Sequence, residues 1–162
     1  MDTIITNLDI DLKLIKSDVL EIPNTVKPRD NRYDVLFNCN TFDTILNYVI
    51  KIISDETNEI FDTYIKRVQG YIQTNDRPTP ISIERQLKSG ILPIPKYSFI
   101  YMIDAFNTKL EINSNIIKPS NGDLIVFKTT DFKKDECSSF NRIALIGSIT
   151  NELTVTNRSS LL

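Results

Sequence analysis

Arg142 is the residue of this chain best suited to hold a carboxylate, because it opens the apolar run "RIALIGSI". A guanidinium presents its N–H donors in a planar fork that matches both oxygens of a carboxylate. If its side chain lies inside the fold, Arg142 would therefore bind the carboxylate of a small acid. Arginine is found more often at the surface, where it would open the strand and point to solvent. The sequence alone leaves both interpretations open.

The other side chains that do chemistry have no suitable partner. The chain contains no histidine, which removes the commonest general base and the usual serine or cysteine triads. Cys137 and the two serines that follow it have no base in sight, so we expect no role for them. Asp135 and Glu136 are adjacent, so on a strand they point to opposite faces, and in a loop we expect them to be solvated. We predict no catalytic residue.

Composition limits the possible partners. The net charge is −2 and the pI is near 5.2, so nothing draws the chain to nucleic acid or to an anionic membrane. No stretch approaches the roughly 20 apolar residues of a membrane span, and the N-terminus does not resemble a signal peptide. Cys39 and Cys137 are the only cysteines, and we expect free thiols. We predict a soluble cytoplasmic or virion protein that is not secreted through a signal peptide.

The length of 162 residues predicts a single domain, 1–162. In "LDIDLKLI", apolar residues alternate with polar ones, which predicts a strand, and prolines then indicate a connection, so 1–30 is interpreted as leading strand and connection. Residues 41–70 show apolar residues at helical spacing and are predicted to form two supporting helices, with Thr41 as N-cap and Gly70 as the stop.

Residues 71–156 are predicted to form a β core. The runs "YSFIYMIDAF", "TKLEI", "LIVFK", "RIALIGSI" and "LTVT" are typical of strands, and Asn121-Gly122 predicts a hairpin turn. Strands that follow helices indicate an α+β fold in which helices cover one face of the β core.

Residues 70–150 resemble the double-stranded β-helix core of the iron- and 2-oxoglutarate-dependent dioxygenases, particularly the small prolyl-hydroxylase-like members of phages and bacteria. "YSFIYMIDA" is similar to the strand after that family's first metal motif. "IIKPSNGDLIVFK" resembles its pattern of proline, glycine turn and apolar strand, here Pro119, Gly122 and Phe127. "NRIALIGSI" resembles its final core strand, whose first arginine binds the 2-oxoglutarate carboxylate. The resemblance implies a jelly-roll-like double-stranded β-helix and gives Arg142 that position.

The chain departs from this family at the metal. The family holds iron with a histidine–carboxylate pair and a distal histidine, and no histidine exists here. At the corresponding places the chain offers carboxylates, among which Asp76, Glu84 and Asp131 would form an oxygen-only site suited to magnesium or calcium. Nothing in their spacing demands such a site, so we predict no metal and no cofactor.

The proline-rich segment 76–96 is long for a connection, and Ile91, Leu92 and Ile94 would make an apolar patch of the kind found at interfaces. We therefore predict a non-catalytic pseudoenzyme: a β-helix domain that binds other proteins in a larger assembly, such as a subunit of a phage or other viral particle. Arg142 would be its relic ligand-binding residue. Two alternatives remain open, a divergent 2-oxoglutarate-dependent oxygenase with carboxylate metal ligands and a cupin-like small-molecule binding module.

Overall fold

The structure is a computed structural model that describes residues 1–24, 26–27, 31–35, 39–73, 80–83, 95–136 and 141–151. The helical elements are α1 (Leu12–Glu21), η1 (Ile22–Asn24), α2 (Asn40–Thr57) and η2 (Thr129–Asp131). The strands are β1 (Ile4–Asn7), β2 (Arg32–Asp34), β3 (Tyr64–Ile72), β4 (Tyr97–Asp104), β5 (Lys109–Ile112), β6 (Asn115–Ile117), β7 (Asp123–Lys128), β8 (Phe132–Glu136) and β9 (Ile143–Asn151).

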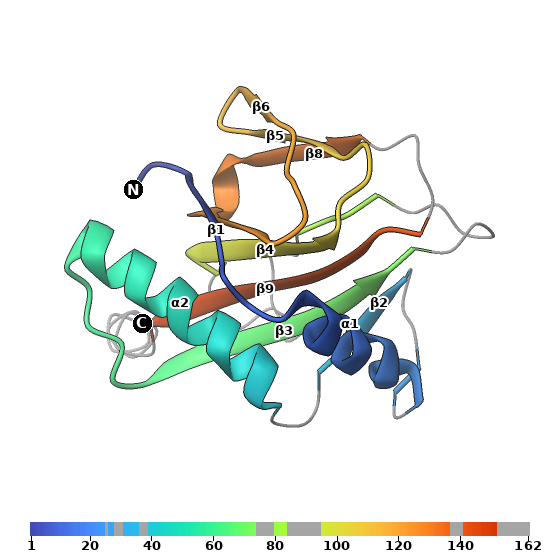
Figure 1. Cartoon of the computed structure of the whole chain (residues 1–162). Coiled ribbons are helices and arrows are strands. Elements are labelled where there is room, and N and C mark those ends of the chain that lie inside the picture. The colour runs from blue at the N-terminus through green and yellow to red at the C-terminus, as the bar shows by residue number, and fades with distance from the viewer. Residues whose placement is uncertain are drawn as a thin grey trace.

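The strands form two antiparallel sheets (Figure 1). The larger sheet has the order β1-β7-β4-β9-β3-β2, and the smaller has the order β6-β5-β8. An apolar cluster fills the inner side of the larger sheet and includes residues of the smaller one: Tyr71, Ile81, Ile100, Met102, Ala105, Leu110, Ile112, Ile125, Phe127, Phe132, Ala144 and Ile146. The barrel interior is therefore largely packed with side chains.

Both helices cover the outer face of the larger sheet (Figure 1). Alternate residues of its strands pack there against the helices, among them Phe99, Tyr101 and Leu145. The described residues thus have the predicted α+β double-stranded β-helix architecture, with two helices on one face. The β part is not confined to 71–156, because β1, β2 and most of β3 precede residue 71.

A leading strand is present, but it is β1 at residues 4–7 and not the predicted run 8–15. Residues 12–21 form α1, and the side chain of Asp11 caps it by accepting a hydrogen bond of 3.1 Å from the Leu14 backbone N–H. The buried residues of this helix are Ile15 and Val19, four apart, whereas Leu14 of the alternating pattern is 52% exposed. The sequence of this segment fits both an alternating pattern and a helical one. The Asp11 cap and burial of one face against the sheet favour the helix.

The second predicted helix is also wrong, because residues 64–72 form β3. All nine residues of β3 pair with β9, from Tyr64 opposite Asn151 to Ile72 opposite Ile143. Helix propensity is a weak preference that tertiary pairing overrides. Gly70 does not stop a helix but lies within the strand, where a Cβ would come within 2.7 Å of the Ile22 side chain. Its missing side chain makes room for η1 on the sheet.

The start of α2 differs from the prediction as well. The N-cap position is Cys39 rather than Thr41, and it makes no side-chain capping bond. The Thr41 hydroxyl instead donates to the Asp18 carboxylate at 2.5 Å, which ties α2 to α1.

The predicted hairpin at Asn121-Gly122 is a different kind of turn. Gly122 has the positive φ of 87° that the turn requires, but the strands on either side of it, β6 and β7, belong to different sheets. The tight hairpin lies between β5 and β6, where Asn113 and Ser114 both have positive φ.

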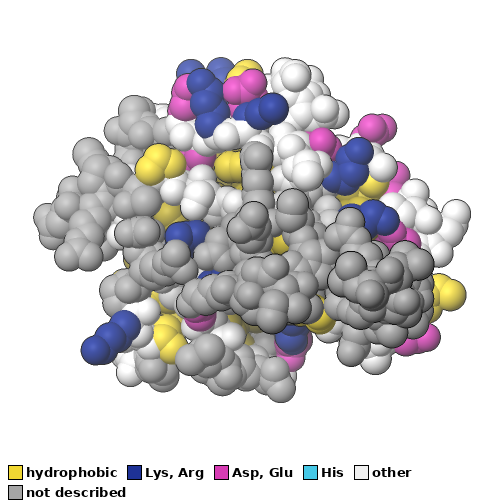
Figure 2. All heavy atoms as spheres, turned by 180° about the vertical axis from the view of Figure 1, so that it is seen from behind, with side chains coloured by type: hydrophobic (Ala, Val, Ile, Leu, Met, Phe, Trp, Pro, Cys, Tyr) yellow, Lys and Arg dark blue, Asp and Glu magenta, His cyan; other side chains and the backbone are white. Residues whose placement is uncertain are grey.

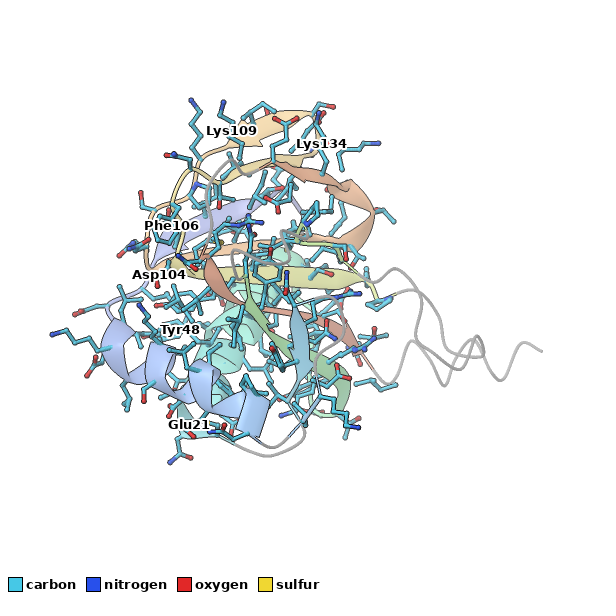
Figure 3. All side chains as sticks on the ribbon, turned by 90° about the vertical axis from the view of Figure 1, so that its right-hand side faces the viewer. Glu21, Tyr48, Asp104, Phe106, Lys109 and Lys134 are labelled. Carbon is cyan, nitrogen blue, oxygen red and sulfur yellow. The ribbon has the colours of Figure 1, made fainter. Side chains whose placement is uncertain are left out.

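Charged side chains gather at the end of the molecule formed by the smaller sheet, seen at the top of Figure 2. In Figure 3, Lys109 and Lys134 extend from this sheet, far from Glu21 on α1. Lys134 forms an exposed ion pair of 2.7 Å with Glu136, so positive and negative charges are interspersed there. Among the described residues, no helix is long and apolar enough to cross a membrane.

Candidate functional site

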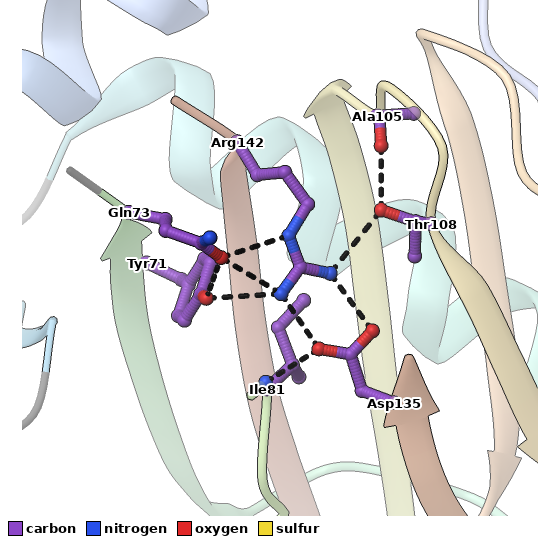
Figure 4. A network of polar contacts seen from close by, with 7 residues as sticks. All are labelled: Tyr71, Gln73, Ile81, Ala105, Thr108, Asp135 and Arg142. Carbon is purple, nitrogen blue, oxygen red and sulfur yellow. Dashed lines mark hydrogen bonds and ion pairs between the residues drawn. The ribbon is translucent and has the colours of Figure 1, made fainter. Parts of the chain in front are cut away.

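Arg142 lies inside the barrel at the start of β9, where only 1% of its side chain is exposed (Figure 4). Ile143 faces the helices, so the strand alternation turns Arg142 to the inner side of the sheet. The interpretation that placed this arginine in solvent is excluded. An arginine in such a place needs partners, because an unpaired buried charge is costly.

The Asp135 carboxylate supplies the main partner. Its Oδ1 accepts a hydrogen bond of 2.8 Å from Nη1 of Arg142, and its Oδ2 accepts one of 2.7 Å from Nη2. Oδ2 also accepts a hydrogen bond of 2.7 Å from the Ile81 backbone N–H. The arginine is thus held in the bidentate geometry that suits a carboxylate, but the carboxylate belongs to the chain itself.

Neutral side chains bind the remaining donors of the guanidinium. Gln73 Oε1 accepts from Nε at 3.1 Å and from Nη2 at 3.0 Å, and the Tyr71 hydroxyl accepts from Nη2 at 3.0 Å. Thr108 Oγ1 accepts from Nη1 at 3.2 Å. The guanidinium also lies 5.3 Å from the centre of the Tyr71 ring, within the range of a cation–π interaction.

These acceptors are themselves oriented by further bonds. The Tyr71 hydroxyl donates to Gln73 Oε1 at 2.6 Å, and the Thr108 hydroxyl donates to the Ala105 carbonyl at 2.5 Å. Tyr71 lies on β3 with Gln73 just beyond its end, Thr108 directly precedes β5, and Asp135 lies on β8, so both sheets contribute to the network. A guanidinium has five N–H donors, and every nitrogen of Arg142 donates to one of these acceptors.

An irregularity in β8 explains why Asp135 points inward. In the pairing of β8 with β5, Lys134 lies opposite Glu111 whereas Phe132 lies opposite Ile112, so the register shifts between these two pairs. Strict alternation would put Phe132 and Asp135 on opposite faces, yet both are buried. A bulge that inserts one unpaired residue re-aims the side chains beyond it. Asp135 and Glu136 thus lie on a strand and point to opposite faces, as predicted for a strand, and the alternative of a solvated loop is wrong.

A separate pocket with a cavity volume of about 20 Å³ lies between β3, β9 and the segment 80–83. Its lining residues are Arg67, Gln69, Ser82, Ile83, Ile146, Gly147 and Ser148, and we call it the Arg67 pocket. On its β3 side, Arg67 and Gln69 donate to Asp34 Oδ1 of the neighbouring strand at 3.2 and 2.7 Å. Both polar and apolar side chains thus line the Arg67 pocket.

Most of the other residues singled out from the sequence cannot be placed. Asp76, Glu84, Cys137 and the interface residues Ile91, Leu92 and Ile94 lie outside the described residues. Asp131 is on η2, where its backbone carbonyl accepts a hydrogen bond of 2.8 Å from Asn113 N. Within the part of the chain that the structure describes, no three Cys, Asp or Glu side chains come together as a metal site would require.

Sequence reasoning missed Tyr71, Gln73, Thr108 and Asp135 as members of a buried polar network. Tyr71 and Gln73 carry a usable signal, because they are two residues apart on a strand and so share a face. That signal does not say which other strands the face meets, so it does not point to Arg142. The sequence gives no such signal for Asp135, because the alternation of polar and apolar residues does not reveal a bulge.

The fold is that of known oxygenases. No protein-family model matches the sequence, and no curated protein matches it. A viral collagen prolyl hydroxylase from Paramecium Bursaria Chlorella virus-1 is similar in structure over 92% of this chain and 89% of that chain, with a TM-score of 0.65 and 11% identity. A Pseudomonas putida prolyl-4-hydroxylase matches over 92% of each chain, with a TM-score of 0.62 and 9% identity.

A Burkholderia pseudomallei oxidoreductase of the 2OG-Fe(II) oxygenase family is also similar, over 92% of this chain and 85% of that one, with a TM-score of 0.52 and 14% identity. At these identities the likeness establishes the double-stranded β-helix fold. It also contradicts the prediction that the chain is not an enzyme, because these neighbours are enzymes by name. Nothing in the comparisons supports a virion, phage or structural role.

Proposed function

We propose that this chain is a divergent enzyme of the oxygenase fold that binds a small group of its substrate in the Arg67 pocket. The observation that supports the proposal is this small hollow beside an otherwise packed interior, in a chain whose structural neighbours are enzymes over 92% of its length. The structural role expected from the sequence has no comparable support.

The size and lining of the Arg67 pocket indicate what it takes. Pockets for drug-sized ligands enclose roughly 300–1,000 Å³, whereas this cavity measures about 20 Å³, so it takes only a small group of a larger substrate. The hydroxyls of Ser82 and Ser148 can donate or accept, and Ile83 and Ile146 supply an apolar wall. A methyl or hydroxyl group of a substrate bound at the surface fits this lining.

The iron and 2-oxoglutarate implied by the name of the Burkholderia neighbour do not fit the described residues. Imidazole is absent from the whole sequence, and the described acids form no cluster of three. Arg142, which the resemblance assigned to 2-oxoglutarate, already holds Asp135. We therefore derive no step through either group, and we assign the side chains of the Arg67 pocket the tasks of binding and orienting the substrate.

The carboxylates in the sequence favour one second candidate, a divergent oxygenase with oxygen-only metal ligands. Ser82 and Ile83 line the Arg67 pocket, and Glu84 follows them directly in the chain. Oxygen-only ligands would suit magnesium, calcium or manganese rather than ferrous iron. Alternatively, the chain is a cupin-like module that binds a small molecule in the same pocket without turning it over.

The first experiment is a thermal-shift and calorimetric screen of the full chain with L-proline, a proline-rich peptide, small hydroxy acids and Mn²⁺, Mg²⁺, Ca²⁺ or Fe²⁺ under anaerobic conditions. The test variant is Ser148→Leu, which fills the Arg67 pocket, and its matched control is Ser17→Leu on the exposed face of α1. We expect at least one organic probe to raise the melting temperature of the wild type and of Ser17→Leu but not of Ser148→Leu.

Turnover then separates the candidates. Product formation by mass spectrometry from a probe that binds identifies an enzyme, and its dependence on a stoichiometric metal identifies the oxygen-ligand oxygenase. Binding without product identifies the cupin-like module and contradicts the proposed enzyme. If no probe distinguishes Ser148→Leu from Ser17→Leu, the Arg67 pocket is not the site.

A further inference from the structure

The interior of the barrel contains a carboxylate-binding site that is already occupied. The guanidinium of Arg142 and the carboxylate of Asp135 face each other in a bidentate pair, and their side chains are 1% and 0% exposed. Figure 4 shows the acceptors from both sheets arranged around the guanidinium, and the Ile81 backbone N–H donating to Asp135. This is the geometry with which an arginine recognises a small acid.

The pair is closed to a second acid. Both terminal nitrogens of Arg142 donate to Asp135 and also to a neutral acceptor, and Nε donates to Gln73. The neighbouring acceptor Thr108 is itself only 2% exposed. An incoming carboxylate would have to displace Asp135 and leave that charge buried without a partner, which is strongly unfavourable.

We propose that Asp135 is an internal ligand of Arg142: it occupies the carboxylate-binding face of the guanidinium and excludes free carboxylates from this end of the barrel. The bulge in β8 turns the Asp135 side chain toward Arg142, because under regular alternation that side chain would point away. The chain thus carries a complete acid-recognition site whose ligand is covalently part of the protein. This inference does not depend on the Arg67 pocket, which shares none of the residues of the network.

Removal of the internal ligand should convert the network into a site for an external one. Asp135→Ala leaves Arg142 with its neutral partners and a space of the size of a carboxylate, which formate or acetate can fill. Asp135→Asn keeps the volume filled and removes only the charge. Asp55→Ala, at an exposed position on α2, is the matched surface control for loss of an aspartate.

The experiment measures melting temperature against sodium formate, sodium acetate and 2-oxoglutarate, with sodium chloride at equal ionic strength as the reference. For Asp135→Ala we expect a saturable rise specific to the carboxylates, of about 3–6 °C at ten times the dissociation constant. Wild type, Asp135→Asn and Asp55→Ala should respond to the carboxylates only as they do to chloride.

The inference can still be tested if Asp135→Ala does not fold in sodium chloride. In that case, folding restored by acetate but not by chloride supports the inference, and failure to fold in either salt refutes the predicted rescue. Binding of acetate or 2-oxoglutarate to the wild type that Arg142→Met abolishes would overturn the inference. Binding that Ser148→Leu abolishes instead would concern the Arg67 pocket and leave Asp135 as the internal ligand.

Discussion

Asp135 and Arg142 join the two sheets of the barrel, since Asp135 lies on β8 of the smaller sheet and Arg142 directly precedes β9 of the larger one. The two residues are seven apart in the chain, and their carboxylate and guanidinium meet at 2.7 Å. The pair therefore fixes how one sheet sits on the other.

Breaking this pair from one side should be costly. Asp135→Asn removes a bidentate charged partner of the buried Arg142, and we expect the free energy of unfolding to fall by about 3–5 kcal/mol. Arg142→Met should have a similar effect, because it leaves the Asp135 carboxylate buried and unpaired. The double variant Asp135→Leu, Arg142→Met should recover part of the loss, as measured by urea denaturation. A double variant that is as unstable as the sum of the two single ones would contradict this coupling.

Gly147 should not tolerate a side chain. A Cβ at this position would come within 2.5 Å of the Arg67 carbonyl and 2.6 Å of the Phe99 ring. Since neither the β3 backbone nor a fully buried ring can move freely, we expect Gly147→Ala to lower the free energy of unfolding by about 3 kcal/mol. Gly122→Ala, where the positive φ is the main constraint, should cost about 1–2 kcal/mol. Chemical denaturation of both variants tests this order, and an equal or reversed ranking would be evidence against it.

Tyr101 should make the protein sensitive to alkali. Its buried hydroxyl has no hydrogen-bond partner among the described residues, and burial, with a smaller contribution from the nearby Asp123, raises the pKa of the hydroxyl to about 12 from the ordinary value of 10.0. A pKa that is higher in the folded state gives stability that is complete below pH 10 and is lost as the pH rises through 12. Tyr101→Phe should therefore flatten the decline of stability between these pH values.

The same substitution should also help at neutral pH. Tyr101→Phe removes an unsatisfied buried hydroxyl, so we expect a gain of about 1 kcal/mol. Tyr97→Phe is the matched comparison, because the Tyr97 hydroxyl donates to Glu59 at 2.7 Å and its loss should cost about 1 kcal/mol. Melting curves at pH 7 and pH 11 distinguish the two variants, and a destabilised Tyr101→Phe at pH 7 would show that the hydroxyl has a partner in solution.

Asp11 should contribute to the stability of α1. Its carboxylate accepts a hydrogen bond from Leu14 N and satisfies one of the free N–H groups at the start of the helix. We expect Asp11→Ala to cost about 1 kcal/mol, whereas Asp9→Ala, at an exposed residue just before the helix, should have little effect. Equal melting temperatures for the two variants would argue against the cap.

Strands could be predicted from the sequence where the residue composition strongly favours β structure. The segments around Phe99, Val126 and Leu145 are rich in β-branched and aromatic residues, and they form β4, β7 and β9. Residues 12–21 and 64–72 carry both a helical and an alternating pattern, so contacts distant in sequence decide their structure. Arg142 could be identified as a candidate from the sequence. Its partner Asp135 could not, because its orientation depends on a bulge.

The position of β9 has a consequence for how the chain folds. It is the last of the described strands, yet it lies in the middle of the larger sheet, between β4 and β3. Before β9 is in place, β3 with β2 and β4 with β7 and β1 are separate pieces with open edges and an uncovered apolar face. Sheet assembly during translation must wait for β9, which favours slow folding and makes early intermediates prone to aggregation.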